Sequence, residues 1–259
     1  MRRIGLLIIG DELLDGRRQD RHLAHMIEAL GGRGLEPAWC LVCGDDPGLL
    51  TDTLRRTLET SDIVFCFGGI GATPDDCTRE CAAHAAGVGL CRHPAAATLI
   101  ESRFGEAAYP YRIRMADLPD GAQLIPNPVN QIPGFSLGDH HFVPGFPQMA
   151  WPMVDWVLTT HYPTLRRPAR PVSYALRIER TPESELIPIM EQVLTQHPTI
   201  KLSSLPHIGE PPHIELAVRG EPIDAGAAWA RLTGALSAAG IGYMTTDADR
   251  PRGEVGDGR

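Results

Sequence analysis

The first part of the chain alternates buried-strand and helix patterns. Residues 3–10 form an apolar run without polar alternation, which is typical of a strand covered on both faces. Residues 36–43 and 61–67 predict two more strands. Between them, apolar residues recur at helical spacing in residues 21–30, and Asp45 or Asp46 caps a helix with Pro47 in its first turn. This repetition predicts a three-layer α/β domain with a mainly parallel sheet.

The pattern continues with helices over residues 78–87, 94–105 and 150–161, around a loop-rich stretch with short strands at 117–137. Pro152 is tolerated in the last helix only near its start. After a proline-rich linker at 162–171, the order becomes strand, helix, strand, strand, helix, which predicts a small α+β domain. We therefore expect an α/β domain over residues 1–165, an α+β domain over 170–246, and a disordered, charged tail over 247–259.

Composition limits the classes of function. The formal net charge of −8 argues against a nucleic-acid partner, because phosphate contacts need a basic face. No apolar run approaches the roughly 20 residues that span a bilayer, so no membrane association is expected. The start of the chain predicts a first strand and not a signal peptide, which indicates a cytoplasmic protein. The six cysteines lack the paired spacing of a metal site and are expected to be reduced, mostly buried thiols.

The loop after the first strand is acidic. Its sequence, "GDELLDG", contains neither the glycine pattern of a dinucleotide-binding turn nor that of a P-loop. Asp11 and Glu12 instead suit the hydroxyl groups of a ribose or a hard divalent cation. For Asp15 the simpler interpretation is a helix cap or a solvated turn.

The loop after the third strand, "FGGIGATPDD", combines glycines with two aspartates. Its glycines allow close approach of a ligand, and the helix that follows offers free N–H groups to an anion. Asp75 and Asp76 would repel a phosphate, unless a cation such as Mg²⁺ lies between the phosphate oxygens and a carboxylate. One of the two aspartates is explained equally well as a cap of that helix.

Four ordered stretches of the chain resemble a known family. They are residues 8–16 with Asp20, residues 67–76 followed by "TRE", residues 118–135, and "PGFPQM" at 144–149. Together they resemble the molybdopterin-binding-like (MoCF) domain, specifically the N-terminal domain of the competence/damage-inducible CinA family. The resemblance covers about residues 4–158 and implies a MogA/MoaB-like fold.

The resemblance also implies a function. CinA N-terminal domains hydrolyse ADP-ribose-type pyrophosphates with a divalent metal, a related FAD synthase domain hydrolyses FAD, and other relatives bind molybdopterin or its adenylate, usually as oligomers. A homo-oligomer is therefore expected. The family's catalytic and metal-holding positions correspond to Asp75 and Asp76. Its ligand-binding positions correspond to Gly10, Asp11, Glu12, Asp20, Gly68, Gly69, Gly71, Thr73, Asn127, Pro128, Pro133, Gly134, Pro144, Gly145 and Pro147.

Several positions depart from the family. His22 stands where the family commonly has asparagine. Ala72 and Pro74 are the positions at which this chain departs from the family's common "GPTKDD" motif, and Gln148 stands in place of a Ser-Glu pair. The motif thus loses a lysine and the last loop loses an acid. Three arginines are candidates to replace the lysine's charge, although a solvated surface explains each more simply: Arg17, Arg18 and Arg79.

Two hypotheses follow. The first is a Mg²⁺-type pyrophosphohydrolase that acts on an ADP-ribose-like nucleotide diphosphate and releases AMP. The second is a binding module for a nucleotide or pterin phosphate, without turnover, that serves as a sensor or carrier. The retained Asp75 and Asp76 favour the first, and the lost lysine and glutamate favour the second. The adjacent His140 and His141 would face opposite sides of a strand, so a turn or sheet edge is expected there instead of a metal site.

Overall fold

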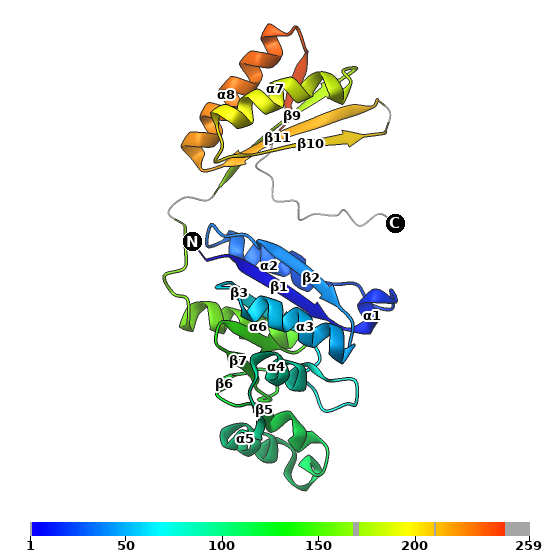
Figure 1. Cartoon of the computed structure of the whole chain (residues 1–259), viewed down its shortest axis with the longest axis vertical. Helices are drawn as coiled ribbons and strands as arrows, with labels where there is room; N and C mark the ends of the chain where they lie inside the picture. Colours follow the sequence, from blue (N-terminus) through cyan, green and yellow to red (C-terminus); the bar gives the residue numbers. More distant parts are fainter. Residues whose placement is uncertain (1, 168–170, 210, 247–259) are drawn as a thin grey trace. The chain divides into compact units, whose positions relative to one another are not determined.

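The chain folds into two compact units, and the division in the sequence falls between Arg166 and Arg167. The computed structural model describes residues 2–167, 171–209 and 211–246. The tail predicted over residues 247–259 lies outside the described residues. Figure 1 shows the elements of each unit. Within the described residues, no helix is both long enough and apolar enough to pass through a bilayer.

The first unit is built on a six-stranded, mostly parallel sheet. Its strands follow the order β2-β1-β3-β8-β7-β6. The pairs β2–β1, β1–β3 and β3–β8 are parallel, whereas β7 runs antiparallel to both β8 and β6. The bounds are β1 (Ile4–Ile9), β2 (Trp39–Cys43), β3 (Ile63–Phe67), β6 (Gln123–Ile125), β7 (Gly134–Leu137) and β8 (His140–Val143). β4 (Leu90–Arg92) and β5 (Asp117–Pro119) form a separate antiparallel pair.

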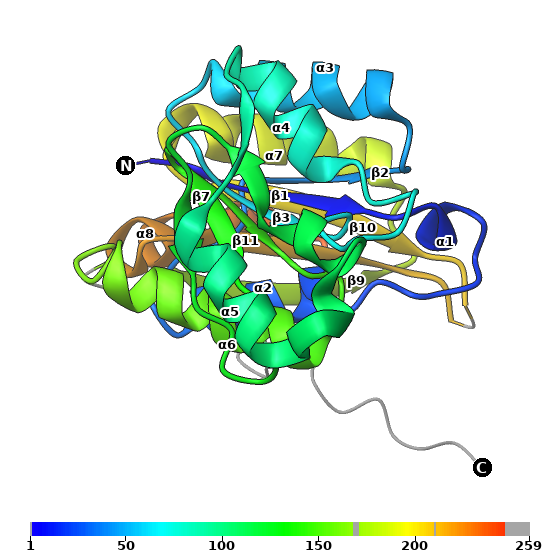
Figure 2. The same cartoon turned by 90° about the horizontal axis from the view of Figure 1, so that it is seen from below.

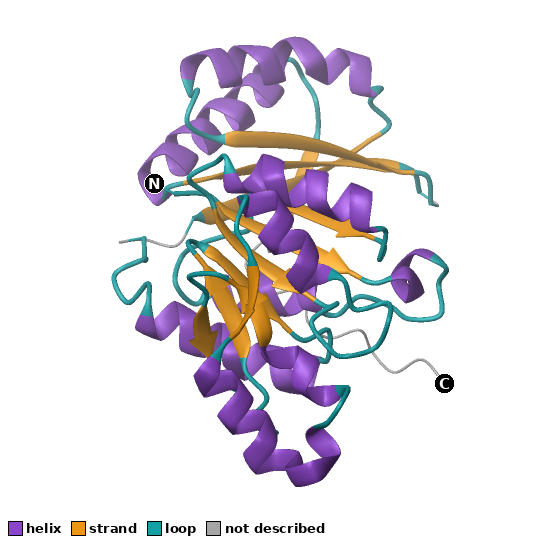
Figure 3. Ribbon diagram, turned by 60° about the horizontal axis from the view of Figure 1, so that its bottom comes forward, coloured by secondary structure: helices purple, strands orange, loops and turns teal. Residues whose placement is uncertain are grey.

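Helices cover both faces of this sheet, as Figures 2 and 3 show. One face packs on α2 and α6, and the other on α3, α4 and α5. The α-helices of this unit are α1 (Asp11–Leu14), α2 (His22–Gly31), α3 (Pro47–Leu58), α4 (Thr78–Ala86), α5 (Pro94–Phe104) and α6 (Pro147–Thr160), with 3₁₀ turns η1 (Gly105–Ala108) and η2 (Arg112–Ala116). The predicted three-layer α/β class with a mainly parallel sheet is confirmed.

The helix ends follow local chemistry. The Asp46 carboxylate accepts the Leu49 N–H at 2.7 Å, and Pro47 occupies the first turn of α3, as the sequence predicts. α6 begins at Pro147 and therefore carries Pro152 inside the helix, so the expectation that Pro152 lies near the start was wrong. Although this proline lacks an N–H to donate, the residues after it are buried against the sheet and keep the helix in place.

His140 and His141 lie in the interior strand β8, between β3 and β7, so the predicted turn or edge was wrong. Their rings point to opposite faces and each finds polar partners. His140 Nε2 lies 3.0 Å from the Thr57 hydroxyl, and the His141 ring lies 2.8 Å from the hydroxyls of both Ser136 and Tyr162. Burial lowers the pKa of His140 from 6.5 to about 4 and that of His141 to about 3. Both imidazoles are therefore neutral.

The six cysteines, all in the described part of the chain, are free thiols. Cys43, Cys66 and Cys81 are buried, whereas Cys91 is exposed. Burial raises the pKa of Cys40 to about 11. The buried cysteines pack as small apolar residues.

The second unit is a small α+β sandwich. Its sheet has the order β10-β11-β9-β12 and is antiparallel throughout. In its core, Leu176 and Leu216 of the sheet pack with Leu186 of α7 and Leu232 of α8. The bounds are β9 (Val172–Glu179), α7 (Glu183–Gln196), β10 (Lys201–His207), β11 (His213–Gly220), α8 (Pro222–Ala238) and β12 (Tyr243–Thr246). The pattern of the sequence predicts all of these except β12.

Candidate functional site

A cavity of about 440 Å³ opens at the carboxyl ends of β1, β3 and β8. From β1 the sheet extends through β2 in one direction, and from β3 through β8 in the other. Such a reversal of strand order is the usual ligand position in open α/β sheets. The predicted residues that line this main cavity are Gly10, Glu12, Gly68, Gly69, Gly71, Thr73, Asp75, Asp76, Asn127, Pro133, Pro144 and Gly145.

Five predicted residues lie elsewhere. Asp20 and Pro147 line a smaller cavity of about 190 Å³. Asp11 and Pro128, with Gly134 in strand β7, are absent from the described walls of both cavities.

The floor of the main cavity is made of backbone. Gly68 has a φ of 111°, and a Cβ there would lie 2.3 Å from the Ile9 carbonyl oxygen. Its N–H donates to the Val143 oxygen at 3.0 Å. Gly145 also lies against Gly68, since a Cβ on it would be 3.4 Å from the Gly68 Cα. The ends of β1, β3 and β8 thus meet without intervening side chains, which requires glycine at position 68.

The next glycine joins the loop to α4. Gly69 has a φ of 67°, and a Cβ on it would lie 2.1 Å from the buried Thr78 hydroxyl oxygen. That hydroxyl donates to the Gly68 carbonyl at 3.1 Å, and the Thr78 N–H donates to the Gly69 carbonyl at 3.0 Å. The N-terminus of α4 is therefore attached directly to the glycine loop, and its positive dipole end lies beside the cavity.

The two aspartates of the motif differ in their environments. The Asp76 carboxylate accepts the Thr73 N–H at 2.9 Å and the Thr73 hydroxyl, so it closes the loop. No side chain caps α4, whose first flanking residue is Cys77, so the capping interpretation was wrong. Asp75 is exposed, and the Thr73 hydroxyl holds its pKa below the usual value.

Further carboxylates make the rim acidic. Asp11 and Asp45 each accept the other's backbone N–H, at 3.1 and 2.9 Å, and join the loops after β1 and β2. Burial, followed by repulsion from Asp11, Glu12 and Asp75, raises the pKa of Asp45. Among the described residues, no three His, Cys, Asp or Glu side chains form a ready-made metal-ligand group.

Asn127 supplies a polar group with unused capacity. The residue is 4% exposed, and its Oδ1 accepts the Val129 N–H at 3.0 Å. Its Nδ2 is buried and has no hydrogen-bond partner in the described structure. Because an unsatisfied buried donor is costly, a ligand acceptor at this wall of the cavity would be stabilised.

The three candidate arginines have different environments. Arg79 is 3% exposed, and its guanidinium donates to the Arg114 carbonyl, so its assignment to a solvated surface was wrong. Arg17 is exposed and pairs with Asp15, as expected. Arg18 is exposed, as expected, and it also lines both cavities, a position that only the path of its loop determines.

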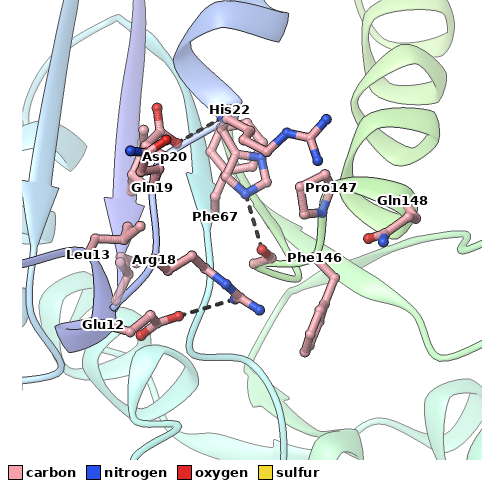
Figure 4. A pocket seen from close by; sticks show the side chains of 14 residues that line it. Glu12, Leu13, Arg18, Gln19, Asp20, His22, Phe67, Phe146, Pro147 and Gln148 are labelled. Carbon is pink, nitrogen blue, oxygen red and sulfur yellow. Dashed lines mark hydrogen bonds and ion pairs between the residues drawn. The ribbon is translucent and has the colours of Figure 1, made fainter. Parts of the chain in front are cut away.

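The smaller cavity adjoins the main one, and Figure 4 shows its wall. His22 is 5% exposed, lies 4.3 Å from the Phe67 ring in a stacked arrangement, and approaches the Gly145 carbonyl at 3.2 Å. Burial lowers the pKa of His22. The Asp20 carboxylate accepts the N–H groups of His22 and Leu23, so it also holds the start of α2.

The family model described as a probable molybdopterin binding domain matches residues 5–167. The chain belongs to this MoCF family. A CinA-like protein of Frankia casuarinae is 34% identical over 192 residues, which cover 69% of this chain and 44% of that protein. A CinA-like protein of Gloeobacter violaceus is 38% identical over 132 residues, 50% of this chain and 31% of that protein. The chain spans less than half the length of these two relatives.

A solved structure supports the same assignment. The protein CinA, with unknown function, from Thermoplasma acidophilum superimposes with a TM-score of 0.56 and 28% identity, covering 61% of this chain and 98% of that one. A protein of Pyrobaculum arsenaticum is 28% identical over 211 residues, 78% of each chain. The predicted resemblance to MoCF and CinA proteins is confirmed.

The departures of this MoCF chain from the family pattern lie around the two cavities. Pro74 is exposed beside Asp75 in the glycine loop, and Ala72 lines the main cavity. His22 and Gln148 line the smaller cavity. Three of these four positions therefore line a cavity, and Pro74 lies between Thr73 and Asp75, which line the main one.

Proposed function

We propose that the chain binds a nucleotide- or molybdopterin-type phosphate in the main cavity and hydrolyses ADP-ribose-like nucleotide diphosphates, releasing AMP. One observation carries the proposal. The glycine loop that leads into α4 and the carboxylate of Asp75 meet at a single cavity, at the point where the strand order reverses. The loop suits a phosphate, and the carboxylate suits a cation or a water molecule.

The residues fit a divalent cation of the Mg²⁺ type. Such an ion is commonly held by one or two carboxylates together with substrate phosphates, so a complete cage of protein ligands is unnecessary. Asp75 would hold it, with Asp45 or Glu12 as the second acidic group at the same cavity. When bound, the ion would neutralise phosphate charge and supply an activated water.

The chain's own residues position the reaction. The glycine loop holds the phosphate next to the start of α4, and Asn127 Nδ2 donates to a ligand oxygen. Water adds to the phosphorus of the adenylate half, and the bridging P–O bond breaks. One proton of the water passes to the released ribose 5-phosphate or to solvent. The products are AMP and ribose 5-phosphate.

A second candidate is a MoCF binding module without turnover. It is favoured by Pro74 in place of the family's lysine and by the engagement of Asp76 with Thr73, which leaves Asp75 as the exposed carboxylate of the pair. Under this hypothesis the same ligand binds but is released intact. With this candidate we also propose a homo-oligomer and a cytoplasmic sensor or carrier role.

One assay distinguishes the two candidates. The full chain is incubated with ADP-ribose or FAD and Mg²⁺, Mn²⁺ or Co²⁺, and AMP is measured by chromatography. Hydrolysis predicts AMP release that falls about a hundredfold in Asp75→Asn. The control is Asp52→Asn, since Asp52 is an exposed carboxylate on α3 paired with Arg55. Isothermal titration of the same chain measures binding of the same compounds. Binding without AMP assigns the binding module, and the absence of both binding and AMP refutes both candidates.

A further inference from the structure

The two cavities share a wall, and that wall carries a cation. Glu12, Arg18 and Phe146 line both spaces, together with Ile9 and Gly145. Among these shared residues Arg18 is the cationic one. Among the described residues that line the main cavity, Arg18 is the one cationic side chain. The acidic side chains there are Glu12, Asp45, Asp75 and Asp76.

From this arrangement we propose that Arg18 binds the pyrophosphate of a two-headed diphosphate between the cavities, with one organic group in each cavity. The inference rests on the proposed function and assigns the two halves of its ligand to the two cavities. Arg18 is then a specificity-determining residue of this chain, placed where it can offset the charge that Pro74 does not supply.

Arg18 is held in position by weak, exchangeable contacts. Its backbone N–H donates to the Glu12 carbonyl at 2.8 Å, which fixes the loop. Its guanidinium lies 3.3 Å from the Glu12 carboxylate and 5.4 Å from the centre of the Phe146 ring, and Figure 4 shows it reaching between them. Both members of the ion pair are partly exposed, so the pair contributes little and Arg18 can exchange Glu12 for phosphate. A guanidinium binds phosphate oxygens in a bidentate manner, and the aromatic face retains it.

The contents of the smaller cavity suit a hydroxylated group. His22 Nε2 lies 3.2 Å from the Gly145 carbonyl, which can only accept, so Nε2 carries the proton and Nδ1 is an acceptor. That Nδ1 is buried and has no partner among the described residues. Gln19 and Gln148 add amide groups to the same wall. The volume of this cavity is about 190 Å³, and that of the main cavity is about 440 Å³. The smaller cavity therefore takes the smaller half of the ligand, a ribose-sized polyol, and the main cavity takes the base or pterin half.

Arg17 provides a matched control for the test. It is adjacent to Arg18 in the chain, is exposed, and pairs with Asp15 outside both cavities. Isothermal titration of the full chain measures the affinities for ADP-ribose, ADP and adenosine in Arg18→Gln, Arg18→Lys and Arg17→Gln. Circular dichroism verifies that each variant is folded.

We expect Arg18→Gln to weaken ADP-ribose and ADP binding about tenfold to a hundredfold and to leave adenosine binding unchanged. Arg18→Lys gives a smaller loss, because lysine keeps the charge but loses the paired donors. The affinities of Arg17→Gln for all three compounds should stay within about twofold of those of the unmodified chain.

The outcomes separate this inference from the proposed function. If ADP-ribose binds but Arg18→Gln loses no more affinity than Arg17→Gln, the role of Arg18 is refuted while the proposed ligand class stands. If ADP-ribose and ADP bind equally to the unmodified chain, the second cavity holds no second group, and the two-headed ligand is refuted. If the unmodified chain binds neither compound, the proposed function fails as well.

Discussion

Adding one methyl group at Gly69 tests whether the glycine loop is locked to α4. In Gly69→Ala the new Cβ would lie 2.1 Å from the Thr78 hydroxyl oxygen, well inside contact distance. The positive φ of 67° costs about 1–2 kcal/mol for any L side chain. Overpacking adds about 1–3 kcal/mol, and loss of the hydrogen bond from Thr78 to Gly68 adds about 1 kcal/mol. The variant should therefore lose about 3–6 kcal/mol of the free energy of unfolding.

Gly87 is the matched control. Its φ is 68°, almost the same as that of Gly69, but a Cβ there meets nothing within 4 Å. Gly87→Ala should therefore carry only the backbone cost of about 1–2 kcal/mol. The excess loss in Gly69→Ala over Gly87→Ala isolates the contact with Thr78.

The assay is urea denaturation followed by tryptophan fluorescence. Trp229 is the tryptophan of the second unit, so a Trp229→Phe background makes the signal specific for the first unit. Thr78→Ala should recover part of the loss in Gly69→Ala, because it removes the oxygen that the new methyl group meets. Equal losses for the two glycine variants, or strict additivity with Thr78→Ala, would show that the loop and α4 are not locked together.

Two further predictions concern stability. His141→Gln should flatten the pH dependence of the free energy of unfolding in acid. The pKa of His141 is about 3 in the folded chain, so below pH 6.5 the unfolded chain alone binds this proton. The stability that His141 contributes above pH 6.5 is therefore lost as the pH falls, by about 1.4 kcal/mol per pH unit. Urea titrations at pH 7, 6 and 5 measure this slope, and an unchanged slope in the variant contradicts the assignment of His141 as buried and neutral. Asp46→Ala should lower the free energy of unfolding by about 1 kcal/mol, because the Leu49 N–H loses its acceptor at the start of α3. Thermal unfolding measures this loss, and Asp52→Ala, further along the same helix, is the control.

The sequence predicted most of the fold because the period of its apolar residues is clear. Apolar runs mark β1 and β3, and the Asp46–Pro47 pair marks the start of α3. Strand β12 was missed because its four residues are mostly exposed and it is defined by its pairing with β9, which no local pattern encodes. The interior position of His140 and His141 in β8 was not predicted for a related reason. Their hydrogen-bond partners lie outside this strand, on α3, on β7 and at Tyr162.

The part of the candidate site that lies within a single loop could be predicted from the sequence. The glycines and aspartates of residues 67–76 can be recognised there, and they line the main cavity. The positions of Arg18 and Asp45 at the cavity could not be recognised, because each reaches it through the path of a different loop. The distinct environments of Asp75 and Asp76 were equally hidden, since the contact of Asp76 with Thr73 depends on how the loop closes.

The backbone floor beneath the main cavity has a consequence for how ligand preference can diverge. Ile9, Gly68 and Gly145 meet there through main-chain atoms, so substitutions elsewhere leave the shape of the floor unchanged. The rim carries side chains instead, such as Arg18 and Phe146. Under the proposed function, chains that share this floor can therefore acquire new ligands by exchanging rim residues, without rebuilding the backbone beneath them.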